Sequence, residues 1–319
     1  MALTEHPVVA SLLPVVLLIA VGWGAGRLGW IREAAVKDLS NLVFLVLIPA
    51  LLFRTMSGVR LDTLDARPIG AYFTAALALL VLLVVWRGFN PRSIVLALGA
   101  VFSNMVMIGI TLIGLAYGQA GLVTLLTLVS VHALVLLTVG SVLLELAQAR
   151  AARSAGDPVS SVWRTAGSAL RGALIHPIPL PILAGLLYAQ TGWGIPAVVD
   201  KPLHLLGQAF GPLALVLVGV NLAATPLAGQ WRETLWLSAV KNVALPLLVG
   251  LSAWAWGIRG LPLVVMVTAA ALPMGANVFL FAQRYQVGQT VITAGMGVST
   301  ALAMLTLSGW MLLMQGWLP

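Results

Sequence analysis

The chain contains no cysteine and very little charge. Of its 319 residues only 8% are charged, whereas 61% are hydrophobic, and the mean hydropathy is +1.05. Soluble globular proteins carry about 25% charged residues, so this composition excludes a soluble fold and predicts an integral membrane protein in contact with the lipid bilayer. The absence of cysteine excludes disulfides and thiolate metal sites, and it leaves the redox compartment open.

Acidic residues are also scarce, and none lies in the middle of an apolar run. The nine acids all fall in expected loops or at the ends of expected helices: Glu5, Glu33, Asp38, Asp62, Asp65, Glu145, Asp157, Asp200 and Glu233. A carboxylate at mid-membrane commonly carries protons or holds cations. Its absence argues against an acid-pair cation/proton antiporter and disfavours a sodium site built on a carboxylate, although a site built on carbonyls alone stays open. We therefore predict no metal site and no cofactor.

The apolar runs predict an all-α membrane protein of ten helices. About 20 apolar residues span a bilayer as a helix, and short polar connections separate the runs. The expected spans are Val8–Leu28, Val36–Thr55, Pro68–Trp86, Ser93–Ala116, Gly121–Ala147, Gly172–Gln190, Pro202–Ala224, Glu233–Trp256, Leu261–Tyr285 and Gln289–Trp317. The longest polar stretch, residues 148–171, is interpreted as a loop.

The basic residues occur singly between the expected spans, which is typical of topology signals and not of a nucleic-acid surface. With the N-terminus outside, the inner loops would hold eleven of the 17 Lys and Arg residues, and Lys241 would lie within a span. The other five would be outside: Arg54, Arg60, Arg67, Lys201 and Arg259. This distribution predicts that both termini are outside and that the 148–171 loop is cytoplasmic.

An internal repeat relates the two halves of the chain. His6-Pro7 recurs as His176-Pro177, Gly22-Trp23-Gly24 as Gly192-Trp193-Gly194, and Trp86 as Trp256, all with an offset of 170 residues. Five spans per repeat is an odd number, so the second repeat must be inverted relative to the first. We therefore expect one five-helix repeat over residues 1–147 and a second over 172–319, an architecture that secondary transporters use.

Two expected spans are interrupted by residues that break helices. The ninth carries Pro273, Gly275 and Asn277, and the fourth carries Asn104 and Gly109, with an offset of 173 residues between the two asparagines. Proline removes a backbone donor, and lipid cannot satisfy the groups that are freed. Broken helices in register predict a substrate site with exposed half-helix ends suited to an anion. The alternative is that Pro273 only kinks a helix and that the asparagines hold helices together.

Lys241 is expected near mid-membrane in the eighth span, where an unpaired lysine is costly. It could neutralise a bound organic anion or move charge across the membrane. Alternatively, it could bond to carbonyls that Pro246 or the broken ninth span leaves free. Possible lining residues are Asn41, Pro49, Ser103, Asn242 and His132, and His132 could instead be a hydrogen-bond partner inside the bundle. Pro212 and Asn221 are interpreted first as packing positions and second as substrate lining.

These segments resemble the auxin efflux carrier family, the relatives of the plant PIN carriers. The resemblance lies in the apolar run from Asn41 that ends in Pro49-Ala50-Leu51-Leu52-Phe53, in the segment Asn104–Gly109, in Lys241 followed by Pro246, and in the Leu272–Tyr285 segment. It covers essentially the whole chain. Thr111 stands where the family often has proline, which predicts a less sharply broken fourth span.

The resemblance implies a bacterial inner-membrane protein with the fold of sodium–bile acid symporters and sodium–proton antiporters. It implies a scaffold of spans 1, 2, 6 and 7, a moving domain of spans 3–5 and 8–10, an elevator-type movement, a homodimer, and substrates such as malonate, malate or auxin-like acids. A cation/proton antiporter on the same fold is the main alternative. A membrane-bound transferase would need an acid cluster or a nucleophile in a loop, and a channel or receptor would show current without saturation.

Overall fold

The computed structural model describes residues 7–60, 65–155, 179–224 and 231–318. Within these ranges the regular structure is helical, and the nearest approach to a sheet is an isolated antiparallel bridge between Ser103 and Met274. Six of the described helical segments are long and apolar enough to cross a membrane: Ala35–Met56, Arg67–Arg87, Met105–Gln148, Ala197–Ala224, Trp231–Ala255 and Gln289–Trp317. Together with the composition, they make the chain an all-α, multi-pass membrane protein.

The helices of the N-terminal half follow the apolar runs, and several are divided. They are α1 (Pro7–Arg27), α2 (Glu33–Leu42), η2 (Val43–Leu47), α3 (Ile48–Met56), α4 (Arg67–Arg87), α5 (Pro91–Val101), η4 (Met105–Gly109) and α6 (Ile110–Ala155). The long α6 bends at Gly118, whose φ of 61° leaves helical geometry. Glycine adopts this left-handed region without steric cost, so the bend separates the expected fourth and fifth spans.

The C-terminal half is built in the same way. Its described elements are α8 (Pro179–Gln190), α9 (Ala197–Ala224), α10 (Trp231–Ala239), η5 (Val240–Ala244), α11 (Leu245–Ala255), α12 (Gly260–Ala271), α13 (Asn277–Arg284), α14 (Gln289–Met314) and η6 (Gln315–Trp317). The segments η2, η4 and η5 are single π-helical turns. Two of them directly precede Ile48-Pro49 and Leu245-Pro246, where the wider turn accommodates the ring and the missing donor of proline.

Two expected boundaries differ from the structure. Helix α9 begins at Ala197, five residues before the expected start at Pro202. Helix α6 continues through Ala155, so the beginning of the 148–171 stretch is helix and not loop. The rest of this loop, the start of the expected sixth span at Gly172, and the His6-Pro7 and His176-Pro177 pairs lie at least partly outside the described residues.

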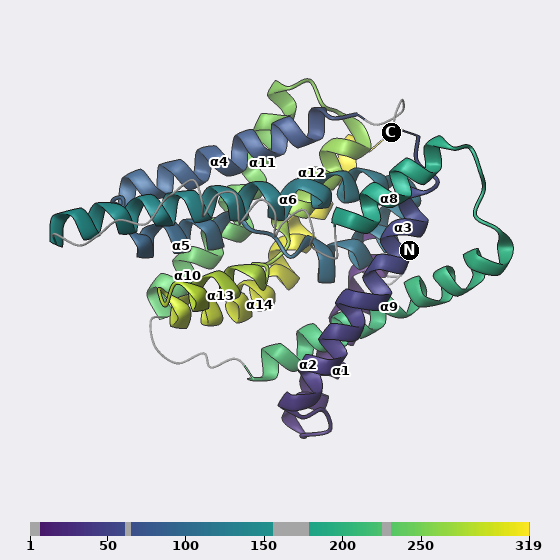
Figure 1. Ribbon diagram of the computed structural model, residues 1–319, viewed down its shortest axis with the longest axis horizontal. Coiled ribbons are helices and arrows are strands. Elements are labelled where there is room, and N and C mark those ends of the chain that lie inside the picture. Colours follow the sequence, from purple (N-terminus) through teal and green to yellow (C-terminus); the bar gives the residue numbers. More distant parts are fainter. Residues whose placement is uncertain (1–6, 61–64, 156–178, 225–230, 319) are drawn as a thin grey trace.

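The helices pack in two groups (Figure 1). The α1/α9 group consists of α1, α2, α3, α8 and α9, and the crossover group consists of α4–α6 and α10–α14. Contacts of α1 with α6 and α14, and of α9 with η4, join the two groups. Any site at this junction is therefore lined from both groups.

Helices α1 and α9 cross at glycine. A Cβ atom on Gly22 would lie 2.0 Å from the carbonyl oxygen of Val216, and one on Gly219 would lie 2.0 Å from that of Ile19. Small residues let helix backbones approach closely in a membrane, where dispersion and not the hydrophobic effect holds helices together. The two glycines therefore fix the spacing of α1 and α9.

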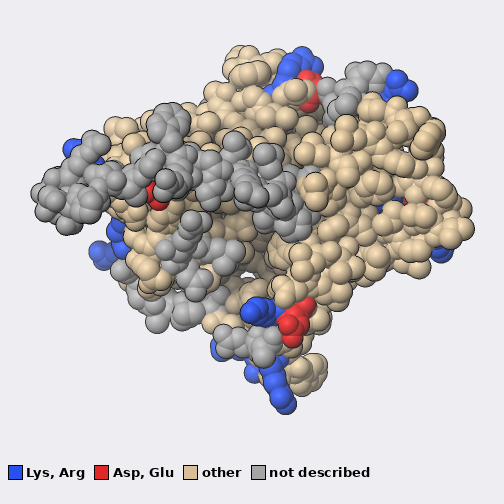
Figure 2. Space-filling model, viewed as in Figure 1, with Lys and Arg blue, Asp and Glu red and all other residues tan. Residues whose placement is uncertain are grey.

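Charged side chains lie mainly at the periphery of the molecule in the view of Figure 2, with broad uncharged areas between them. One ion pair joins the end of α3 to the start of α9, with Arg54 Nε 2.7 Å from Asp200 Oδ1. This arrangement fits a chain whose middle faces lipid and whose ends face water.

Candidate functional site

The two broken spans meet backbone to backbone. The Asn104 N–H donates to the carbonyl of Pro273 at 2.8 Å, and the Gly275 N–H donates to the carbonyl of Phe102 at 2.9 Å. We call the two non-helical segments, 102–104 and 272–276, the crossover. Each break supplies the hydrogen bonds that the other lacks, which is how irregular backbone is tolerated at membrane depth.

The fourth span is fully interrupted, although Thr111 replaces the family's proline. Phe102 has extended geometry with ψ 106°, and Asn104 has ψ 59°, before η4 begins. The expectation of a weaker first break is therefore wrong. Pairing with the other break and capping by Asn104 interrupt the helix without a proline.

Glycine is required where the two breaks touch. A Cβ atom on Gly275 would lie 2.8 Å from Phe102 Cδ1 and 3.1 Å from the Ser103 carbonyl oxygen. A Cβ atom on Gly109 would lie 2.7 Å from Leu272 Cδ1. All three distances are shorter than ordinary contacts. The Ser103 oxygen is backbone, whereas Leu272 Cδ1 is the end of a flexible side chain, so the small size of glycine matters most at Gly275.

Both asparagines stand where a second half-helix starts. Asn104 Oδ1 accepts a hydrogen bond from the Met107 N–H at 3.2 Å, which is N-cap geometry. Asn277 is half-buried and is the first residue of α13. Helix N-termini carry partial positive charge, so the second halves of both broken spans direct positive ends toward the crossover.

Lys241 is completely buried and is bonded to the first half of the ninth span. Its Nζ donates to the carbonyls of Ala270 and Leu272, both at 2.6 Å. These carbonyls lie at the end of α12, where helix carbonyls have no partner within the helix. This is the structural alternative that the sequence leaves open, and it places the Lys241 amino group on the carbonyls beside the crossover.

Asn242 is connected to the crossover by hydrogen bonds through Ser299. Its Nδ2 donates to the Ser299 carbonyl at 2.9 Å, while the Ser299 hydroxyl accepts from the Met274 N–H at 3.1 Å. The Trp310 indole N–H donates to the Asn242 carbonyl at 2.9 Å. Asn242 therefore connects η5 to the crossover through α14, and it does not line the hollow described next.

A hollow of about 50 Å³ lies between the crossover and α9. It is lined by Asn104, Met107, Met274 and Ala276 at or next to the crossover, by Val218, Asn221 and Leu222 of α9, and by Met296, Gly297 and Thr300 of α14. Its walls offer amide, hydroxyl and thioether groups without a carboxylate or a cationic side chain. Because α9 belongs to one group and the other walls to the crossover group, the hollow lies at their junction.

The roles predicted from the sequence for some residues of the hollow differ from their positions in the structure. The sequence predicts packing first and substrate lining second for Asn221, and in the structure Asn221 lies on the wall of the hollow. Thr300 was not singled out, although Met296 and Thr300 are four residues apart on α14 and so share a face. A search for polar residues on the expected tenth span could have found Thr300.

Other sequence-predicted residues do not line this hollow. Pro273 lines a smaller apolar cavity of about 20 Å³ with Val15 and Ile19 of α1. Asn41 is exposed on α2, and Pro49 is half-buried on α3. The structure does not bring the side chains of these two residues to the crossover.

Ser103 belongs to the crossover and bridges Met274, whereas His132 packs against the crossover residue Phe102. The Ser103 hydroxyl is 3.3 Å from the hydroxyl of buried Tyr72. The His132 ring packs edge-on against Phe102, with ring centroids 4.6 Å apart, and against Tyr72 at 5.7 Å. Neither ring nitrogen has a hydrogen-bond partner among the described residues. The interpretation of His132 as a hydrogen-bond partner is therefore not supported, and aromatic packing takes its place.

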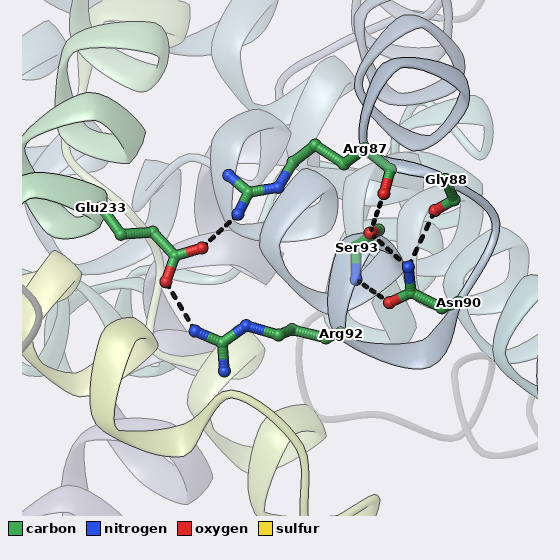
Figure 3. Close-up of polar contacts among 6 residues, drawn as sticks. All are labelled: Arg87, Gly88, Asn90, Arg92, Ser93 and Glu233. Atoms are coloured by element: carbon green, nitrogen blue, oxygen red, sulfur yellow. Dashed lines mark hydrogen bonds and ion pairs between the residues drawn. The ribbon is translucent and has the colours of Figure 1, made fainter.

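An ion cluster connects α10 to the α4–α5 corner (Figure 3). Glu233 accepts hydrogen bonds from Arg87 through one carboxylate oxygen and from Arg92 at 2.5 Å through the other. Asn90 caps α5 by accepting from the Ser93 N–H at 3.0 Å. The cluster joins helices of both halves of the chain. The sequence predicts only that Glu233 lies at the end of a span. It could not predict the ion cluster, because the partners of Glu233 lie more than 140 residues away in the sequence.

Comparison with known proteins places these features among transporters. The family model described as "Membrane transport protein" matches residues 7–311. A protein of Rhizobium meliloti (strain 1021) named "Putative malonate transporter" is 27% identical over 316 residues, which is 96% of each chain. "Auxin efflux carrier component 8" of Arabidopsis thaliana is 24% identical over 245 residues, 65% of this chain and 67% of the relative. "Uncharacterized transporter YfdV" of Escherichia coli (strain K12) is 25% identical, covering 95% of this chain and 96% of the relative.

Proposed function

The chain belongs to the membrane transport family of the auxin efflux carriers, and we propose that it is a secondary transporter of small organic carboxylates. The observation that carries the proposal is the paired crossover with the hollow beside it. Secondary transporters bind substrate where broken helices meet near the membrane midplane. The names of the Rhizobium and Arabidopsis relatives refer to malonate and auxin, and both compounds are carboxylates.

Amide and backbone donors would hold the carboxylate. Asn104 lines the hollow, Asn277 starts the half-helix next to it, and the Pro273–Gly275 break keeps the local backbone out of a helix. Each helix N-terminus contributes about 0.3–1 kcal/mol toward an anion, and up to about 2 kcal/mol when it is partly buried. Lys241 offsets the negative carbonyl end of α12, which would otherwise repel an anion at the same place.

The architecture we propose has ten spans in two inverted repeats, residues 1–147 and 172–319. The α1/α9 group would be the scaffold, and the crossover group would carry substrate by an elevator-type movement in a homodimer. Two features support this division: the hollow lies between the groups, and the Glu233 cluster joins elements of both repeats within the crossover group. The proposed location is a bacterial inner membrane with both termini outside.

A cation/proton antiporter is the second candidate, because it can share this fold. An antiporter site usually needs a carboxylate at mid-membrane. The described walls of the hollow carry amide, hydroxyl and thioether groups instead. The lack of a carboxylate on these described walls disfavours a cation site, and the helix N-termini at Asn104 and Asn277 favour an anion.

Uptake by proteoliposomes tests the proposal. The purified chain would be reconstituted and given radiolabelled malonate or indole-3-acetate, with protein-free liposomes as the control. We expect saturable uptake of at least one carboxylate, and competition by its unlabelled form. For electrogenic transport of one charge, 100 mV supplies about 2.3 kcal/mol, which is about a 50-fold concentration ratio. Uptake equal to that of empty liposomes, combined with Na⁺-dependent proton movement, would instead support the antiporter.

A further inference from the structure

Three buried side-chain oxygen atoms along one face of α10 and η5 have no hydrogen-bond partner among the described residues. Thr234 Oγ1, Ser238 Oγ and Asn242 Oδ1 have none among the described residues, and these side chains are 2%, 0% and 0% exposed. Residues four apart share a helix face, and eight residues rise about 12 Å. We call these three residues the α10 stripe. Buried polar groups are nearly always hydrogen-bonded, and bound water is the usual partner when protein supplies none.

The outer end of the α10 stripe follows Glu233 in the sequence, and the Glu233 partner Arg92 lines a polar cavity. Thr234 follows Glu233, which bonds to Arg87 and Arg92 in the cluster of Figure 3. Arg92 also lines a cavity of about 220 Å³ together with residues 286 and 288–291 at the start of α14. Helix α10 packs against both α5 and α14, the two helices whose first residues line this cavity.

The inner end of the stripe reaches Lys241 and the crossover. Asn242 is adjacent to Lys241 and connects to the crossover through Ser299. An ammonium group has three donors, and the carbonyls of Ala270 and Leu272 accept hydrogen bonds from Lys241. One donor of the ammonium group is therefore left without a partner among the described residues.

Few other charged or titratable groups face Lys241. Helices α11, α12 and α14, which surround η5, contain no ionisable residue. Helix α5 contains only Arg92, at its outer end, and α6 brings His132 behind the crossover. Tyr72 of α4 reaches the Ser103 hydroxyl. Lys241 is thus the cationic group at the inner end of the stripe.

We propose that a file of water molecules occupies the α10 stripe and carries protons between Lys241 and the Arg92 end of the molecule. Outward transfer converts the Lys241 ammonium to an amine. Its proton passes to the nearest water, each water passes one proton to the next, and a hydronium ion leaves at the cavity; inward transfer reverses each step. The file lies inside the crossover group, separate from the hollow that would take the anion. This inference rests on the proposed function. If the chain transports a carboxylate, the water file makes the proton the coupling ion.

Thiol labelling tests for water in the stripe, and the natural chain is a suitable background because it contains no cysteine. Ser238→Cys would be compared with Leu237→Cys, its equally buried neighbour, which lies against the position of Gly295. The thiolate is the reactive form, and apolar burial suppresses it. With methanethiosulfonate ethylammonium applied to vesicles of known sidedness, we expect Ser238→Cys to react at least tenfold faster. Equal rates would overturn the water file, whether or not the chain transports a carboxylate.

Proton movement during uptake tests the coupling. Proteoliposomes containing a pH-sensitive dye would be given malonate or indole-3-acetate, and Ser238→Val would be compared with Ser308→Val. Ser308 is partly buried on α14 and bonds only to the Met304 carbonyl of its own helix. We expect Ser238→Val to reduce proton movement at least tenfold while the thermal shift caused by the same carboxylate is unchanged. Carboxylate uptake without proton movement in the natural chain would overturn the coupling but leave the proposed function intact.

Discussion

Replacing Gly22 by alanine tests how closely α1 and α9 are packed. The added Cβ would lie 2.0 Å from the Val216 carbonyl oxygen and 2.7 Å from its carbon. Favourable contacts begin near 3.5 Å, so the helices must separate by more than 1 Å. Overpacking of this kind costs about 1–3 kcal/mol, and here the obstacle is backbone and not a flexible side chain. Because rigid backbone is the obstacle, we take the upper part of this range, about 2–3 kcal/mol. Alanine regains about 1 kcal/mol of helix propensity, which leaves a net destabilisation of about 1–2 kcal/mol.

The measurement is thermal unfolding in detergent, with Gly24→Ala as the matched control. Gly24 lies on the same helix, and a Cβ there would meet nothing within 4 Å. At about 2–4 °C per kcal/mol, Gly22→Ala should lower the apparent Tm by about 2–8 °C, while Gly24→Ala should leave it unchanged or raise it slightly. Gly219→Ala should behave like Gly22→Ala because its Cβ would meet the Ile19 carbonyl. Equal Tm values for Gly22→Ala and Gly24→Ala would refute the close approach.

Two further substitutions test the crossover group. Glu233→Gln weakens the ion pairs that join α10 to the α4–α5 corner, so it should lower the apparent Tm by about 2–5 °C. The control is Asp65→Asn, which affects an exposed local ion pair with Arg67 and should shift the apparent Tm by less than about 1 °C. Lys241→Met removes the cation beside the crossover and should reduce carboxylate uptake at least tenfold, whereas Lys201→Met, at an exposed site, should retain it. Wild-type uptake by Lys241→Met would rule out a role for this charge in transport.

The positions of the two breaks could be predicted because local chemistry determines them. Pro273 removes a helix donor, and Asn104 and Asn277 are polar residues inside long apolar runs, so uninterrupted helices were unfavourable there. The bond partners of the breaks could not be predicted. The Asn104–Pro273 and Gly275–Phe102 hydrogen bonds join residues about 170 positions apart, and no periodicity within either span contains that information.

The sequence also could not predict roles that depend on how the helices pack against each other. The depth of Lys241 was predictable from its place in the eighth span, but its binding to the α12 carbonyls depends on how α12 packs against η5. Asn221 could be expected inside a kinked helix, yet its place on the hollow depends on how α9 lies against the crossover. His132 has a polar ring, but neighbouring aromatic rings leave its nitrogens without a described partner.

The most direct test of carboxylate binding at the crossover is a thermal-shift titration of Asn104→Asp beside the natural chain. Aspartate can still cap the helix by accepting from Met107, but it places a negative charge on the hollow. Asn90→Asp is the matched control, since Asn90 caps α5 in the same way at the distant corner. Ligand that binds only the folded state raises its stability by about 2.7 kcal/mol at 100 times Kd.

We expect malonate, malate or indole-3-acetate to raise the apparent Tm of the natural chain and of Asn90→Asp, but not that of Asn104→Asp. The Na⁺ and pH dependence of the shift would then indicate the coupling ion. If Asn104→Asp responds to the same carboxylate as fully as the natural chain does, or if Na⁺ or Li⁺ alone produces the shift, the account of an anion site at the crossover is contradicted.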